Sequence, residues 1–90
     1  MDTREWFQAC EEGYFDTIKK MLNTGFDVNC KDDGGRTALC YATFAGAREM
    51  VDLLLQEGCD CNILDKEGHD ALSYADIEGH HDLLPILNRI

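Results

Sequence analysis

The chain has 90 residues, enough for one small domain whose core is close to the lower limit for stability. Hydrophobic residues make up 44% and charged residues 29%, with one proline, so the composition excludes a disordered or low-complexity segment. Eighteen acidic residues against eight basic ones give a net charge of −10, which disfavours nucleic acid and membrane surfaces as partners and favours a basic peptide or protein.

The sequence also predicts a compartment. No apolar run approaches the ~20 residues that a membrane-spanning helix needs, and the first ten residues, MDTREWFQAC, lack the apolar segment of a secretory signal. We therefore expect the chain in the cytosol or the nucleus. Because that setting is reducing, the five cysteines are expected to be free thiols and not disulfides.

The chain repeats itself at a shift of 33 residues. This shift places residues 25–32, GFDVNCKD, on residues 58–65, GCDCNILD, and residues 35–42, GRTALCYA, on residues 68–75, GHDALSYA. It also aligns three glycines, Gly13, Gly46 and Gly79. A repeat of this length indicates an array of stacked structural units.

Three copies follow one another along the chain. The first spans about residues 2–25 and lacks the turn that opens the others, the second spans about residues 33–65, and the third spans about residues 66–90. One copy cannot bury its own apolar face, so the copies must stack. We expect a single domain over residues 1–90, an all-α solenoid of about two and a half helix–turn–helix repeats with β-hairpin-like connections, in which the first and third copies cap the ends.

The second copy illustrates the elements of a repeat. A polar turn precedes a short apolar helix expected at residues 37–45, which stops at Gly46. A second helix is expected at residues 48–56, and Gly58 lies where a left-handed C-cap belongs. In the third copy, Pro85 falls in the first turn of the last helix, where its missing N–H is tolerated.

The motifs carry a family resemblance. GRTALCYA and GHDALSYA are similar to the G-x-T-P-L-H-x-A motif of ankyrin repeats, and GFDVN and GCDCN are similar to the family's G-A-D-V-N. The chain thus resembles an ankyrin-repeat protein over nearly its whole length, which implies a module that binds other proteins. It departs from the motif at the proline (Ala38 and Ala71), the histidine (Cys40 and Ser73) and the threonine (Asp70). We therefore expect its helix starts to be held less rigidly than in a consensus array.

Cys59 and Cys61 flank an acidic residue and raise the question of a metal or redox site. One residue separates them, whereas zinc sites have roughly two to four between paired cysteines, and the chain contains no C-x-x-C. On the resemblance they fall on the alanine and valine of G-A-D-V-N, which are packing positions, and a buried free cysteine behaves as a small hydrophobe. We expect packing, with no metal and no cofactor. For His80, beside His81, the resemblance implies a role at the helix start.

The sequence gives no support for catalysis. It contains no G-x-S-x-G, no phosphate-binding Walker loop, no H-E-x-x-H, and no Cys–His pair that this fold would bring together. In the repeat alignment the acids fall mostly on turns, helix starts and solvent faces. We therefore expect no enzymatic activity.

The resemblance implies a concave binding face built from the loop tips and the first helix of each copy. Tyr41 and Phe44 share one helical face, and Tyr74 and Ile77 repeat this pair 33 residues later. We expect Phe44 and Ile77 to be exposed, because other residues fill the inward positions; the alternative is that they pack as extra core. The expected partner-binding residues are Gln8, Glu11, Glu12, Asp33, Arg36, Tyr41, Phe44, Ala45, Lys66, Glu67, His69, Tyr74, Ile77 and Glu78.

Aromatic anchors inside an acidic rim favour a partner protein or peptide with one or two apolar residues among lysines and arginines. A protein-interaction module is the main hypothesis. The alternatives are a regulatory subunit that masks a partner enzyme's site and an accessory domain of a longer protein. A monomer is expected, with end-to-end association through the last helix as the alternative, using Leu83, Leu84, Ile86 and Leu87.

Two asparagines have a role implied by the resemblance alone. Asn29 and Asn62 correspond to the asparagine that braces the turn in ankyrin repeats. Family members can be hydroxylated at this residue, so Asn62 is also a candidate modification site.

Overall fold

The computed structural model describes residues 3–87 of the chain. Its helical elements are α1 (Thr3–Glu12), α2 (Phe15–Asn23), α3 (Ala38–Phe44), α4 (Arg48–Gln56), α5 (Ala71–Ile77), the 3-10 helix η1 (His81–Leu83) and α6 (Leu84–Leu87). No β-strand occurs within residues 3–87, and the expected all-α class is confirmed. Residue 2 and residues 88–90, at the expected limits of the first and third copies, lie outside the described residues.

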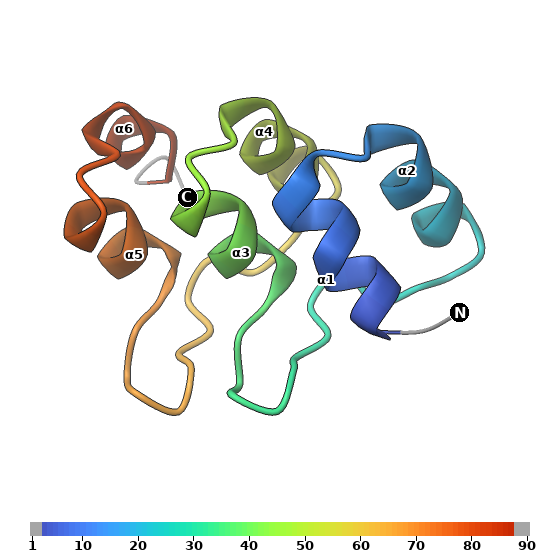
Figure 1. Ribbon diagram of the computed structural model, residues 1–90, viewed down its shortest axis with the longest axis horizontal. Helices are drawn as coiled ribbons and strands as arrows, with labels where there is room; N and C mark the ends of the chain where they lie inside the picture. Colours follow the sequence, from blue (N-terminus) through green and yellow to red (C-terminus); the bar gives the residue numbers. More distant parts are fainter. Residues whose placement is uncertain (1–2, 88–90) are drawn as a thin grey trace.

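The helices form two rows (Figure 1). One row contains α1, α3 and α5, the other contains α2, α4 and α6, and the loops before α3 and α5 project from the same edge of the first row. Contacts between α1 and α3 and between α3 and α5 join neighbouring copies, while each first helix also contacts the second helix of its own copy. The stack thereby covers apolar faces that one helix pair would leave in water.

The helix ends follow the glycines of the repeat. The α3 helix is one residue shorter at each end than expected, with Thr37 and Ala45 as its caps, and α4 has the expected limits. Gly46 and Gly58, just past these helices, have φ angles of 70° and 83°. A side chain is costly in this left-handed region, so glycine is the residue that ends a helix there.

The start of α5 has a cap that the motif comparison did not anticipate. The Asp70 carboxylate accepts a hydrogen bond from the Ser73 N–H at 2.9 Å. Such an N-cap satisfies one of the helix's unpaired N–H groups and contributes about 1 kcal/mol. Replacement of the motif threonine by aspartate therefore supplies a cap, which offsets the loss of bracing expected at this helix start.

The core is continuous through the three copies. Its largest fully buried side chains are Trp6, Ile18, Met21, Leu39, Met50, Leu54, Leu83, Val51, Thr43 and Cys10. At the C-terminal end, Leu83, Ile86 and Leu87 are buried and Leu84 is half-buried against the core. These side chains attach the third copy to the stack. End-to-end association through this helix stays a prediction, and of the four side chains only Leu84 is partly open to a second molecule.

Polar contacts fix the register between the second and third copies. The Lys66 N–H donates to the Gly34 carbonyl at 2.9 Å, between the two loops. The Asn29 side-chain oxygen accepts the Asp60 N–H at 2.7 Å, which confirms the bracing role expected of this asparagine. Asn62, the corresponding residue one copy later, is exposed, and its side chain makes no such bond within residues 3–87.

His80 joins the third copy to the end of α3. Its Nε2 lies 3.1 Å from the Phe44 carbonyl oxygen, and a Cβ added to Gly46 would come within 2.8 Å of the imidazole ring. The ring therefore lies where only a glycine leaves room. This agrees with the helix-start role that the resemblance implies for His80.

The contact between Gly46 and His80 predicts unequal costs for two glycine substitutions. Gly58→Ala adds only the left-handed strain, about 1 kcal/mol, because no atom lies within 4 Å of its added Cβ. Gly46→Ala adds the same strain and displaces His80 from the Phe44 carbonyl, for a total of about 2 kcal/mol. Urea unfolding would measure both. In a His80→Ala background the two substitutions should cost the same, and a persistent difference would contradict this account.

Candidate functional site

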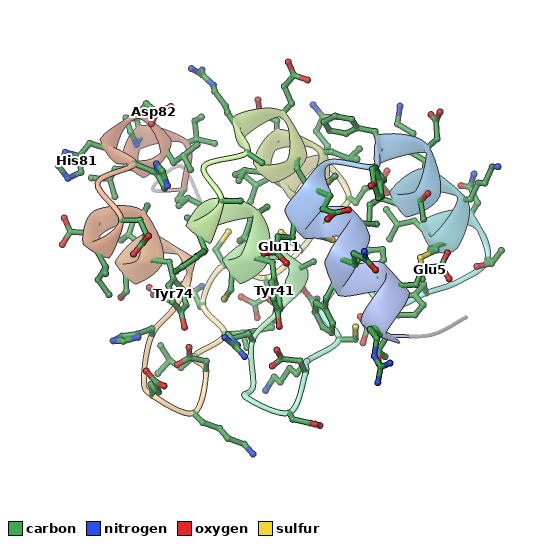
Figure 2. The ribbon with its side chains drawn as sticks, in the orientation of Figure 1. Glu5, Glu11, Tyr41, Tyr74, His81 and Asp82 are labelled. Atoms are coloured by element: carbon green, nitrogen blue, oxygen red, sulfur yellow. The ribbon has the colours of Figure 1, made fainter. Side chains whose placement is uncertain are left out.

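A pocket of about 170 Å³ opens on the surface shared by the three first helices. Its lining residues come from α1, the loop before α3, α3 itself and α5. They are Glu11, Arg36, Cys40, Tyr41, Phe44 and Tyr74. Figure 2 labels Glu11, Tyr41 and Tyr74, which project from α1, α3 and α5 respectively. Each of the three copies therefore contributes to one pocket.

Each loop is tied to the following helix by an aspartate–tyrosine pair. The Tyr41 hydroxyl donates to Asp32 and the Tyr74 hydroxyl donates to Asp65, nine residues earlier in both cases. The other oxygen of Asp32 accepts the N–H groups of Gly34 and Arg36 at 2.9 and 2.8 Å. The carboxylate thus closes the loop and fixes the tyrosine ring at the pocket wall.

The pKa shifts of the tyrosines and aspartates favour neutral hydroxyls paired with ionised carboxylates, as expected of hydrogen bonds that hold the loops in place. Burial raises the pKa of Tyr41 to about 12, and the hydrogen bond to Asp32 acts in the same direction. Burial and the bond to Asp65 likewise raise the pKa of Tyr74. Burial alone would raise the pKa of each aspartate, but the bonds that it accepts outweigh this effect and lower its pKa. At neutral pH the tyrosines are therefore neutral donors to ionised carboxylates.

Two large apolar side chains lie exposed beside the pocket. Phe44 is 51% exposed and Ile77 is 58% exposed. The Phe44 ring meets the Tyr74 ring edge to face, with 6.1 Å between centroids and 77° between planes, which is a favourable aromatic geometry. Phe44 is therefore held in place while much of its ring stays in water, which excludes the alternative that these two side chains are extra core.

The charges at the pocket are unequally paired. The Arg36 guanidinium lies 5.5 Å from the centre of the Tyr41 ring, and its Nε is 3.2 Å from the Asp32 carboxylate. Glu11, which lines the pocket from α1, is exposed and makes no ion pair within the described residues. The pocket thus has one compensated cation and one uncompensated carboxylate.

The structure brings together part of the residue set expected from the sequence. Five of its members line the pocket, and Ile77 lies one helical turn after Tyr74. His69 packs edge to face on the Tyr74 ring at 5.5 Å, and Glu12 accepts a hydrogen bond that raises the pKa of Tyr14. The remaining members are exposed outside the pocket: Gln8, Asp33, Ala45, Lys66, Glu67 and Glu78. Their role in binding stays a prediction.

Sequence reasoning missed three side chains at the surface or in the pocket. Cys40 lines the pocket although it is 2% exposed, and Tyr14 and Leu64 are large, exposed and apolar. Leu64 aligns with Lys31 of the previous copy, so a polar-to-apolar change within the repeat could have identified it. Cys40 replaces the histidine of the motif. From this departure the sequence predicted a less rigid helix start, and not a side chain in the pocket.

The cysteines occupy packing positions. Cys59 belongs to the buried core and Cys61 packs against it, as the repeat alignment predicted. Burial raises the pKa of Cys59 to about 12 and also raises that of Cys61. A thiol in such a setting is a poor nucleophile and a poor metal ligand at neutral pH, because both roles require the thiolate. Within residues 3–87, no three Cys, His, Asp or Glu side chains are grouped to hold a metal ion.

The fold and the pocket together define a short helical repeat protein, with a surface that several copies build jointly. A family model described as ankyrin repeats, three copies, matches residues 6–88. The chain therefore belongs to the ankyrin-repeat family, and the resemblance found in its motifs is confirmed. Ankyrin repeats are generally protein–protein interaction modules. Of the helices in the described part of the chain, none has the length and apolar character needed to span a membrane.

Curated relatives support the same family. Ankyrin repeat domain-containing protein 46 of Rattus norvegicus, and the same protein of Mus musculus, are each 43% identical over 47 residues, covering 52% of this chain and 21% of the relative. Acyl-CoA-binding domain-containing protein 6 of Bos taurus is 39% identical over 54 residues, covering 59% of this chain and 19% of the relative. In each case the match covers only about a fifth of the relative's length.

Proposed function

We propose that the chain binds a protein partner through the concave surface formed by α1, α3, α5 and the loops before α3 and α5. One observation carries the proposal: Phe44 and Ile77 are more than half exposed beside a pocket to which all three copies contribute. Apolar side chains that are held at a pocket but left in water are typical of interface anchors. The proposal includes no catalysis, since the pocket tyrosines stay protonated at neutral pH.

The partner is proposed to combine apolar and basic character. Phe44 and Ile77 would supply most of the affinity, and exposed acids at the rim, among them Glu11, Glu67 and Glu78, would raise the association rate and exclude acidic competitors. The net charge of −10 favours the same partner over nucleic acid or an anionic membrane. We also propose that the chain is a monomer and that it acts in the cytosol or the nucleus.

A role within a longer protein is the second candidate. It is supported by the relatives, because the regions that match this chain make up only about a fifth of their length. The regulatory alternative, in which binding masks the site of a partner enzyme, uses the same surface and differs only in the identity of the partner. Both are therefore forms of the same binding function.

Affinity capture followed by hydrogen-exchange mapping would test the proposal. The chain would be used as bait in a cell extract, the bound protein identified and purified, and amide exchange measured with and without it. Added protection is expected in α3, α5 and the loops before them, with α2 and α4 unchanged. Protection confined to α2 and α4 would place binding on the opposite row and overturn the proposal. An enzyme whose activity falls on binding would favour the regulatory form.

A further inference from the structure

The pocket beside Phe44 has features that select among possible occupants. Its volume of about 170 Å³ is close to the ~150 Å³ of a protein cavity that holds one benzene ring, which is room for one side chain. Aromatic rings form much of its wall, contributed by Tyr41, Phe44 and Tyr74. The hydroxyls of both tyrosines are already used by aspartates, so the rings are what an occupant meets.

The charges distinguish three classes of occupant. An acidic side chain would face Glu11, and the one cation of the pocket, Arg36, is already engaged by Asp32. A purely apolar side chain would remove water from the Glu11 carboxylate without giving it a partner, which costs free energy. A basic side chain avoids both penalties, because its cationic head pairs with Glu11 while its aliphatic stem covers the rings.

The electrostatics of Tyr41 support the position of that carboxylate. Burial and the bond to Asp32 are the main causes that raise the pKa of Tyr41, and the charge of Glu11 adds to them. Glu11 and the Tyr41 ring line the same pocket, and the contribution of Glu11 is the smallest of the causes that act on Tyr41. A cation placed between this carboxylate and the ring would be attracted by both.

We propose that the pocket binds one lysine or arginine side chain of the partner, and that Glu11 is the residue that sets this specificity. The inference rests on the proposed function, since it names the chemistry of the partner at the same surface. The basic head lies beside Glu11 of α1, in the pocket that Phe44 also lines from α3, whereas Ile77 lies on the neighbouring helix α5. Neighbouring helices are about 8–10 Å apart, a distance that an extended chain covers in about three residues. The partner segment therefore carries a basic residue and, about three residues away, an apolar one.

Selection from a random twelve-residue peptide library displayed on phage tests this inference. The whole chain serves as bait, and peptides that also bind a Phe44→Glu, Ile77→Glu double variant are removed. The surviving peptides should be enriched in a basic residue about three positions from an apolar one. Glu11→Gln should raise their Kd about five-fold, and Glu11→Lys should shift a new selection toward acidic residues.

Glu5→Gln is the matched control, because it makes the same charge change in the same helix at an exposed residue (Figure 2). It should leave Kd within about two-fold of the original value, a change well below one kcal/mol. Surviving peptides without the basic residue, or equal effects of Glu11→Gln and Glu5→Gln, would overturn the inference and leave the proposed function standing. A selection that yields no peptide dependent on Phe44 and Ile77 would overturn both.

Discussion

Phe44→Glu combined with Ile77→Glu is expected to weaken partner binding at least a hundred-fold while the chain stays folded. Both side chains are more than half exposed, so their replacement removes little buried apolar area from the fold. In a complex, however, each glutamate would place a charge where the partner presents an apolar group, and a buried unpaired charge is costly. Isothermal titration with the captured partner would measure the loss, and helical circular dichroism would report the fold.

Leu64→Glu is the matched control for this double variant. Leu64 is 57% exposed and lies in the groove between the two loops, away from the pocket. The same change in polarity there should leave binding within about three-fold if the helical surface supplies the anchors. If Leu64→Glu weakens binding as much as the double variant does, the anchors extend to the loops. Unchanged binding by the double variant would contradict the proposed surface altogether.

The period of 33 residues was sufficient to predict the fold. A repeat fixes which positions are equivalent, so helix limits inferred for one copy transfer to the next. The α4 helix has the limits that the sequence predicted, and Gly46 and Gly58 adopt the left-handed conformation expected of helix-ending residues. These features depend on local sequence, because a glycine marks a position where the backbone can adopt a left-handed conformation that other residues disfavour.

The pocket was predictable only in part, because its shape depends on contacts between copies. The helical spacing of Tyr41 and Phe44 predicted that the two share a face, and the structure places both at the pocket. It did not predict that Asp32 would accept the hydrogen bond of the Tyr41 hydroxyl, or that Glu11 would line the pocket with no ion pair to any described residue. Those features arise from tertiary packing, which the spacing of residues along one helix cannot predict.

Asp65→Ala should destabilise the fold by about 2–4 kcal/mol, the largest loss expected of any single polar substitution in the loops. Asp65 is 8% exposed and accepts three hydrogen bonds, from the Tyr74 hydroxyl and from the Glu67 and His69 N–H groups at 2.9 Å each. Its removal leaves three donors without an acceptor in a partly buried site. Each buried donor that stays unsatisfied costs about 1–3 kcal/mol. Urea unfolding at pH 7 would measure the difference.

The matched control is Asp33→Ala, which removes an exposed carboxylate from the tip of the preceding loop. It should change the free energy of unfolding by less than about 0.5 kcal/mol. Equal losses at the two positions would mean that the charge matters and the hydrogen bonds do not. Tyr74→Phe, which removes one donor and keeps the carboxylate, should cost about 1 kcal/mol.

The pH dependence of the Asp65→Ala effect provides an independent check on its cause. Burial opposes ionisation of Asp65, but the bonds from Tyr74 and the two N–H groups prevail and lower its pKa below the value of about 3.9 in an unfolded chain. A depressed pKa means that the stabilisation is complete well above pH 4 and is lost as the pH falls toward the folded-state pKa. The difference between the wild type and Asp65→Ala should therefore narrow below about pH 4. A difference that stays constant down to pH 2 would show that lost packing, and not the ionised carboxylate, accounts for the effect.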